Sequence, residues 1–231
     1  MTMPLVAAHR GASRAERENT IKAFQAAGRL GAAMVELDVR RTADGDLVVH
    51  HDATIGAISI VAMHTDQLPT YVPLLSDALD ACGAMEVNIE IKSDRREPDY
   101  DESHHVARHV VALLRVRGDG QRMLISSFDM DAIDQVHALD PTLRTGFLFT
   151  VPLPNIAALV DDVVARGHVA LHPHRHAAVA ELVDAAHHHG LVVNVWTVDV
   201  PDEMRRLAAI GVDVIITNVP DIAAATLSHE S

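Results

Sequence analysis

Short apolar segments alternate with longer helix-like segments along the whole chain. The apolar segments are rich in β-branched residues and too short for helices, so they predict strands. The segments between them repeat apolar residues at helical spacing. The predicted strands cover residues 5–9, 34–39, 87–92, 123–128, 145–149, 169–172, 192–196 and 214–217. The predicted helices cover residues 20–30, 73–82, 102–116, 130–138, 154–166, 177–189, 201–210 and 220–228.

This alternation indicates an α/β protein with a parallel sheet, because each strand is followed by a helix that can cross back over the sheet. Eight such units in a chain of 231 residues predict a (β/α)8 TIM barrel. Helix ends support these positions, since Pro220 suits a first helical turn and Gly211 suits the end of a helix. We interpret residues 1–231 as a single domain, because no linker-like segment divides them.

One additional element interrupts the alternation after the second strand. Residues 42–46 read Thr-Ala-Asp-Gly-Asp, which is typical of a hairpin turn. Residues 47–50 then return as a strand that leads to His51 and Asp52. We therefore predict a small β-hairpin on the C-terminal rim of the barrel.

Composition narrows the possible partners. The formal net charge is −13, which disfavours nucleic acids and anionic membranes because both require a basic face. No apolar run approaches the roughly 20 residues of a membrane-spanning helix. Cys82 is the only cysteine, so no intrachain disulfide can form, and we expect a reducing, cytoplasmic compartment. The sequence does not indicate an oligomeric state.

Three carboxylates stand in apolar surroundings near the ends of predicted strands. Glu36 and Asp38 are two residues apart in one strand, so their side chains point to the same face. Glu90 lies in the next barrel strand along the chain. Ionised carboxylates in such surroundings are costly unless they are paired or bind a metal. This set predicts a site for one hard divalent cation, Mg²⁺ or Ca²⁺.

Histidines and basic residues flank these carboxylates. His9 and Arg10 end the first strand, His51 follows the hairpin, and Lys92 ends the third barrel strand. Catalytic residues of TIM barrels lie at the C-terminal ends of strands. We therefore predict that His9 and His51 transfer protons and that Arg10 and Lys92 bind an anionic phosphate. Together with a metal, this predicts cleavage of a small phosphate ester.

Structural interpretations of some of these residues stay open. Glu90 and Lys92 can form an ion pair within the strand, and His9 alone can be a core histidine. Trp196 either packs against the alcohol part of a phosphate-ester substrate or fills the barrel core. His172, at the end of a predicted strand, can line the mouth, and a second zinc or nickel site with His174 and His176 is the weaker alternative.

Several motifs follow one another in order along the chain: His9-Arg10-Gly11, Glu18-Asn19-Thr20, Glu36-Leu37-Asp38-Val39, Asp44-Gly45 and Val48-Val49-His50-His51-Asp52. In this order the chain resembles the glycerophosphodiester phosphodiesterase family, from about His9 to about Thr226. The resemblance implies a TIM barrel that hydrolyses glycerophosphodiesters to glycerol 3-phosphate and an alcohol with a divalent cation. It also implies that His9 and His51 are the acid/base pair, that Glu36, Asp38 and Glu90 are the metal ligands, and that Arg10 and Lys92 contact the phosphate. These are the roles predicted above from the residues alone, and the resemblance selects His51 over His50.

The sequence departs from the family pattern at three places. Residues 53–69 are short and lack the arginine that usually follows the His-Asp motif. Asn218 stands where an aspartate is common, and Asp199 stands where an asparagine is common. These changes bear on the alcohol side of the substrate and on a polar network at the eighth strand, and they remove no predicted ligand.

Two other functions compete with this one. A lysophospholipase-D-like enzyme would need an apolar groove or a membrane-facing helix, and the chain has only 3% aromatic residues. A non-enzymatic barrel that binds a phosphorylated metabolite would need cations, but no pair of proton-transferring histidines. We therefore expect hydrolysis of small, soluble glycerophosphodiesters.

Overall fold

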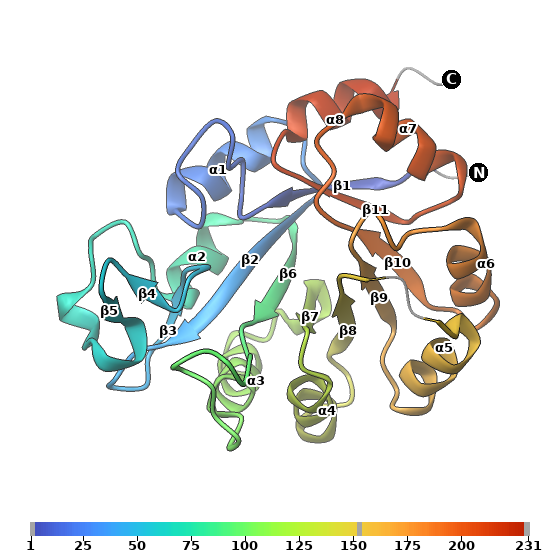
Figure 1. Ribbon diagram of the computed structural model, residues 1–231. Helices are drawn as coiled ribbons and strands as arrows, with labels where there is room; N and C mark the ends of the chain where they lie inside the picture. Colours follow the sequence, from blue (N-terminus) through green and yellow to red (C-terminus); the bar gives the residue numbers. More distant parts are fainter. Residues whose placement is uncertain (1–2, 152–153, 229–231) are drawn as a thin grey trace.

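The computed structural model describes residues 3–151 and 154–228, which form a closed barrel of parallel strands surrounded by helices (Figure 1). The barrel closes because β1 pairs in parallel with both β2 and β11. The barrel strands are β1 (Leu5–His9), β2 (Met34–Arg41), β6 (Glu86–Ile91), β7 (Met123–Ser127), β8 (Arg144–Phe149), β9 (Ala170–Pro173), β10 (Val192–Val195) and β11 (Val214–Thr217). The predicted TIM barrel is confirmed.

Helices follow the strands and cover the outside of the barrel (Figure 1). Side-chain caps fix several helix starts: the Thr20 hydroxyl accepts a hydrogen bond from the Ala23 amide, and the Asn155 side chain accepts one from Ala158. The helices are α1 (Ile21–Arg29), α2 (Leu75–Ala81), α3 (His105–Arg117), α4 (Met130–Leu139), α5 (Ile156–Ala165), α6 (Ala180–His188), α7 (Pro201–Ala209) and α8 (Pro220–Ser228).

The predicted hairpin is also confirmed. β3 (Leu47–Val49) pairs with β2 in antiparallel fashion, with Val39 opposite Val49. Gly45 lies in the turn with a φ of 89°, a backbone conformation that glycine adopts without strain. Further elements, which the sequence did not predict, follow within residues 54–67. They are the two-stranded sheet of β4 (Thr54–Ile55) and β5 (Ile58–Ser59) and the 3₁₀ turns η1 (Ile60–Ala62) and η2 (Thr65–Gln67); a third turn, η3 (Gly120–Arg122), precedes β7.

The core lies mainly between the barrel wall and the helices. One apolar cluster joins the first helices to β2, β6 and β7, and a second joins α5–α8 to β9–β11. The barrel interior is more polar, since Asn88, His172 and Asn194 are all fully buried. One interpretation of the sequence placed His172 at the mouth of the barrel, but the side chain is buried in the interior, where its Nε2 lies 3.1 Å from Asn194 Nδ2.

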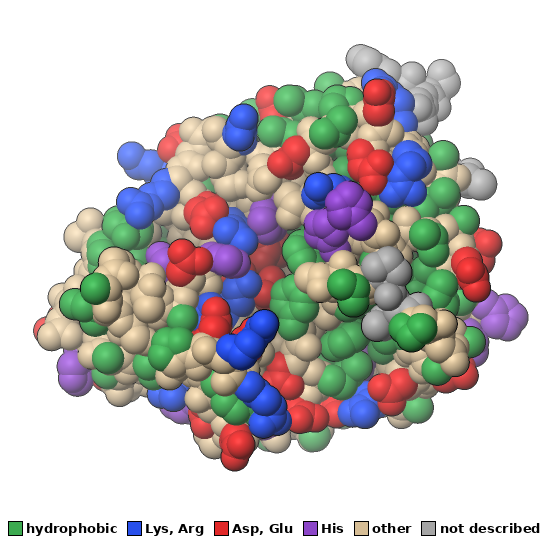
Figure 2. Space-filling view, in the orientation of Figure 1, with side chains coloured by type: hydrophobic (Ala, Val, Ile, Leu, Met, Phe, Trp, Pro, Cys, Tyr) green, Lys and Arg blue, Asp and Glu red, His purple; other side chains and the backbone are tan. Residues whose placement is uncertain are grey.

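No helix in the described part of the chain is long and apolar enough to cross a membrane. The face at which the parallel strands end is hollowed over the barrel (Figure 2). Acidic, basic and histidine side chains gather around this hollow.

Candidate active site

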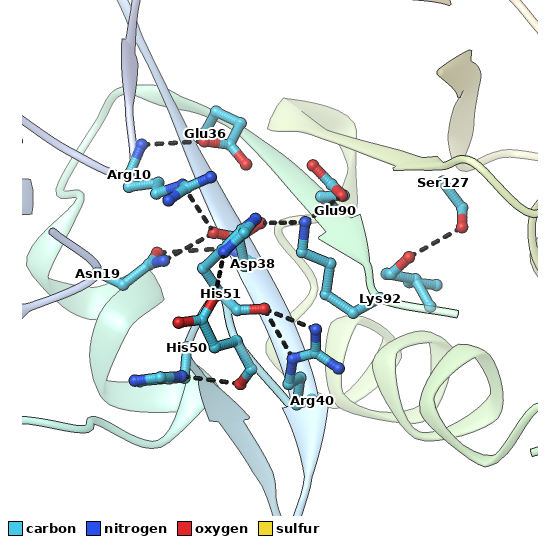
Figure 3. A network of polar contacts seen from close by, with 12 residues as sticks. Arg10, Asn19, Glu36, Asp38, Arg40, His50, His51, Glu90, Lys92 and Ser127 are labelled. Atoms are coloured by element: carbon cyan, nitrogen blue, oxygen red, sulfur yellow. Dashed lines mark hydrogen bonds and ion pairs between the residues drawn. The ribbon is translucent and has the colours of Figure 1, made fainter. Parts of the chain in front are cut away.

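Three adjacent strands bring most of the predicted site residues together (Figure 3). His9 ends β1 and Arg10 follows it, Glu36 and Asp38 lie in β2, and Glu90 lies in β6. The strand register places His9 beside Glu36 and Asp38 beside Glu90. Because these strands are parallel neighbours, the side chains meet at one end of the barrel.

The three predicted metal ligands converge. One carboxylate oxygen from each of Glu36, Asp38 and Glu90 lies within 4.8 Å of the others, and no other group of acidic, histidine or cysteine side chains in the described residues has this spacing. All three residues are buried. Glu36 Oε1 has no hydrogen-bond partner among the described residues. A buried oxygen without a partner, in a set of hard oxygen donors, fits a divalent cation.

The electrostatics of the three carboxylates differ. Burial raises the pKa of Glu36 well above its usual value, and the charges of Asp38 and Glu90 raise it further. Burial also raises the pKa of Glu90. At Asp38, burial opposes ionisation, but Lys92 and Arg10 outweigh it and hold the pKa well below its usual range. Without a cation, the site thus carries one firmly ionised carboxylate and two that resist ionisation.

Two basic side chains balance this acidic cluster. Lys92 Nζ lies 2.6 Å from Glu90 Oε1 and 2.9 Å from Asp38 Oδ1. Arg10 Nε lies 3.2 Å from Asp38 Oδ2. Burial opposes the charge on Lys92, but Glu90 and Asp38 raise its pKa overall. Both cations therefore remain charged beside the carboxylates, where they can contact an anion.

A strained turn after β1 places Arg10. Its φ is 56°, in the left-handed region, and the next residue, Gly11, has a φ of 79°. A side chain at Gly11 would lie 2.6 Å from the Ala23 backbone, so the turn requires glycine. Asn19 closes the turn, because its backbone N–H donates to the Arg10 carbonyl at 2.9 Å and its side-chain Nδ2 donates to Asp38 Oδ2 at 2.7 Å. Backbone strain of this kind is concentrated at functional sites.

His9 is oriented by residues from the other end of the chain. Asn218 Nδ2 donates to Asp199 Oδ2 at 2.6 Å, so Asn218 Oδ1 is left to accept the proton of His9 Nδ1 at 2.7 Å. The unprotonated Nε2 of His9 then faces the carboxylates, 3.9 Å from Glu36 Oε2. Burial, followed by the charge of Arg10, lowers the pKa of His9. Asn218 and Asp199, two of the three departures from the family pattern, thus form one hydrogen-bonded pair.

His51 is oriented by its own neighbour. Its Nδ1 lies 2.7 Å from Asp52 Oδ1, which leaves Nε2 free. Burial, followed by the charge of Lys92, lowers the pKa of His51. His50 also hydrogen-bonds through Nδ1, to the Asp52 carbonyl at 2.9 Å. Of the two histidines predicted for proton transfer, His9 and His51, each has an Nε2 with no hydrogen-bond partner among the described residues.

Trp196 lies on another part of the barrel rim, just beyond β10. Its indole N–H donates to the His172 carbonyl at 2.8 Å. Phe128 and His174 each contact the indole edge to face, with ring centroids 5.5 Å and 5.2 Å from it. Trp196 is half-buried, so part of the ring remains accessible. The Ser127 hydroxyl donates to the Ile91 carbonyl at 2.8 Å and is not placed as a nucleophile.

Comparison with known families gives a clear match. The sequence model of the Glycerophosphoryl diester phosphodiesterase family matches residues 9–69 and 59–222. The chain belongs to this family. A glycerophosphodiester phosphodiesterase of Caldanaerobacter subterraneus is 31% identical over 239 residues, which cover 94% of this chain and 95% of the relative. The family membership and the enzyme class expected from the sequence, a phosphoric diester hydrolase, are confirmed.

Solved structures agree with this assignment. A glycerophosphodiester phosphodiesterase from Parabacteroides distasonis superposes with a TM-score of 0.85 at 26% identity, covering 97% of this chain and 97% of that one. An Oleispira antarctica phosphodiesterase, solved with its product sn-glycerol-3-phosphate, superposes with a TM-score of 0.85 at 22% identity, covering 98% and 97%. The second likeness supports the fold of the family and nothing more.

Sequence reasoning missed one residue of the site and left the contacts of others open. Asn218 and Asp199 were noted only as departures from the family pattern, and Asn19 only as part of a motif. Arg40 was missed, although its position two residues after Asp38 places it on the same face of β2. A search along that face would have found it.

Proposed function

We propose that this member of the family is a metal-dependent enzyme that hydrolyses small glycerophosphodiesters to glycerol 3-phosphate and an alcohol. The observation that carries this proposal is the buried set of Glu36, Asp38 and Glu90, flanked by two cations and by two histidines with free Nε2 atoms. Phosphate binding alone would need the cations, but neither the carboxylates nor the oriented imidazoles.

In this proposal Glu36, Asp38 and Glu90 hold one Mg²⁺ or Ca²⁺, which supplies positive charge to a phosphate oxygen. Arg10 and Lys92 contact the remaining phosphate oxygens. Their charges are preorganised, since both side chains already lie within 3.2 Å of a carboxylate oxygen. The surplus negative charge of the transition state is thereby stabilised without rearrangement of the barrel.

His9 and His51 transfer the two protons. One Nε2 accepts the proton of the attacking hydroxyl, and the other, protonated at the start of the step, donates a proton to the oxygen of the leaving alcohol. The hydroxyl belongs to water or to the glycerol of the substrate itself; the second route gives a cyclic phosphate that water then opens. A lowered pKa favours the unprotonated form near neutral pH, which the imidazole that acts as the base requires, and the active fraction of the enzyme is the one in which the other imidazole carries a proton.

Trp196 is the proposed contact for the glycerol or alcohol part of the substrate. Its accessible ring lies beside Phe128 and His174, which together form an aromatic wall on the β7–β10 side of the mouth. Glycerol 3-phosphate is the product recorded for the Oleispira phosphodiesterase, and this agrees with the product proposed here. The net charge of −13 disfavours stable binding to anionic membranes. The reducing cytoplasm remains the proposed compartment.

Turnover of matched substrates tests the proposal. Glycerophosphocholine is compared with a long-chain lysophosphatidylcholine below its micelle concentration, each with chelator alone and with added Mg²⁺ or Ca²⁺. We expect cation-dependent release of glycerol 3-phosphate and a higher kcat/KM for glycerophosphocholine. A preference for the lysolipid favours the lysophospholipase-D-like alternative, and binding of glycerol 3-phosphate without turnover of any diester favours the non-enzymatic barrel.

A further inference from the structure

Arg40 has a guanidinium that is buried at the edge of the candidate active site (Figure 3). The residue is 1% exposed and lies in β2, two residues beyond Asp38. Side chains two apart in a strand share a face, so Glu36, Asp38 and Arg40 form one line along β2. The first two belong to the cluster of carboxylates, and Arg40 lies next to that cluster, nearer the C-terminal end of β2.

This guanidinium makes two kinds of contact. Its Nε and Nη2 donate to the backbone carbonyl of His51 at 2.8 Å and 2.6 Å. Its Nη1 donates to Glu97 at 2.9 Å and to Asp99 at 2.6 Å, and Nη2 also donates to Glu97 at 3.1 Å. Glu97 and Asp99 belong to the loop that follows β6 and Lys92. Arg40 therefore joins three segments: β2, the segment of His51 and the loop after β6.

The two carboxylates of Glu97 and Asp99 already neutralise the charge of Arg40, so charge balance does not explain its hydrogen bonds to the His51 carbonyl. A purely structural ion pair does not require two hydrogen bonds to one particular carbonyl, and a fully buried arginine is costly to maintain. The carbonyl chosen is that of His51, the residue proposed to transfer a proton. Among the described residues, its side chain hydrogen-bonds only to Asp52, which belongs to the same segment.

We propose that Arg40 is a positioning residue for His51: it ties the His51 backbone to β2 and to the loop after β6, so that the imidazole is held at a fixed distance from the metal ligands. This inference rests on the proposed function. The fork of the guanidinium is needed, because an ammonium cannot donate to the carbonyl and to both carboxylates in one plane. Misplacing a catalytic group by about 1 Å can cost about 100-fold in rate.

The experiment compares the wild-type chain with Arg40→Met, Arg40→Lys and a matched control, Arg117→Met. Arg117 also pairs with two carboxylates, Asp80 and Asp119, but lies at the end of α3 away from the site. Three quantities are measured: kcat and KM on glycerophosphocholine, cation affinity by calorimetry, and hydrogen exchange of peptides covering residues 47–55 and 93–101.

We expect Arg40→Met to lower kcat by about 10- to 100-fold while KM and cation affinity stay unchanged. Hydrogen exchange should become faster only in the two named peptides, Arg40→Lys should restore part of kcat, and Arg117→Met should match the wild type. If Arg40→Met does not fold, Arg40→Lys decides by the same criteria. Wild-type kcat in the Arg40 variant, an equal loss in the Arg117 variant, or a loss confined to KM or cation affinity would overturn the proposal.

These outcomes separate this proposal from the proposed function. A wild-type protein that turns over no phosphodiester refutes the function, and the exchange measurement then decides alone whether Arg40 holds the His51 segment. Unchanged exchange in residues 47–55 refutes that role whatever the activity.

Discussion

His172 makes the stability of this barrel sensitive to acid. The imidazole is 0% exposed, and its Nε2 lies within hydrogen-bond distance of Asn194 Nδ2, a donor, so this nitrogen accepts and the ring is neutral. Its ring also lies against Gly146, where a side-chain carbon would come within 2.8 Å of Nε2. Burial lowers its pKa to about 3, and no charged group among the described residues opposes this effect.

The sign and size of the effect follow from this pKa. An unfolded histidine has a pKa of about 6.5, so at pH 5 the unfolded chain binds a proton that folded His172 does not. Stability from this group is fully present above pH 6.5 and falls as the pH decreases toward 3. Between pH 7 and pH 5, protonation of the unfolded histidine shifts the unfolding equilibrium about 25-fold, which lowers the free energy of unfolding by about 2 kcal/mol.

Urea unfolding at pH 7 and pH 5, with chelator present, measures this loss in the wild type, in His172→Gln and in His188→Gln. Glutamine keeps an acceptor for Asn194 but does not titrate, whereas His188 is exposed at the end of α6. Other titrating groups contribute equally to all three proteins and cancel. We expect the wild type and His188→Gln to lose about 2 kcal/mol more than His172→Gln. Equal losses in the three proteins would refute a neutral, uncompensated His172.

Four further predictions concern the charged site. Added Mg²⁺ or Ca²⁺ should raise the melting temperature of wild-type protein freed of metal by chelator, and a cation concentration of 100 times Kd should stabilise it by about 2.7 kcal/mol. In scanning fluorimetry, Glu36→Gln should show a smaller rise in melting temperature. An unchanged melting temperature in the wild type argues against a metal site. His9→Ala should lower kcat by about 10²–10⁴-fold. In the wild type, the acid limb of kcat/KM should lie below pH 6.5, since burial lowers the pKa of both His9 and His51 and one of them acts as the base; an acid limb above pH 6.5 contradicts that role. Lys92→Met should destabilise the metal-free protein by about 3–5 kcal/mol in urea unfolding, because the ionised, buried Asp38 loses one of its two basic partners, and addition of a divalent cation should recover part of that loss.

Periodicity predicted the barrel well because each strand is a contiguous apolar run. β1 and β11 begin and end where the sequence indicates. β2 runs on to Arg41 because it pairs with β3 beyond the barrel, where its partner is the hairpin and no longer the core. The strands of β4 and β5 have two residues each, too few to show an alternation, so they could not be predicted.

The candidate site was predictable where residues of one strand share a face and unpredictable where contacts join distant segments. Spacing along β2 put Glu36 and Asp38 together, and the rule for TIM barrels added His9 and Glu90 at the same end. The partner of His9, Asn218, lies 209 residues away in the sequence, and those of Arg40 lie 57 and 59 residues away. No local pattern encodes such pairings.

The predicted metal ligands, both basic residues and both histidines of the proposed acid/base pair lie in or directly after β1, β2, β6 and the hairpin, whereas the aromatic wall of Phe128, Trp196 and His174 lies directly after β7, β10 and β9. The two groups are attached to different parts of one rigid barrel. In the proposed enzyme, substitutions in the loops after β7 and β9 can therefore alter which alcohol is accepted without disturbing the carboxylates or the histidines. The loop after β10 also contains Asp199, which orients Asn218 and through it His9, so this residue has to be kept. Libraries aimed at a different leaving group should be confined to these loops, with Asp199 unchanged.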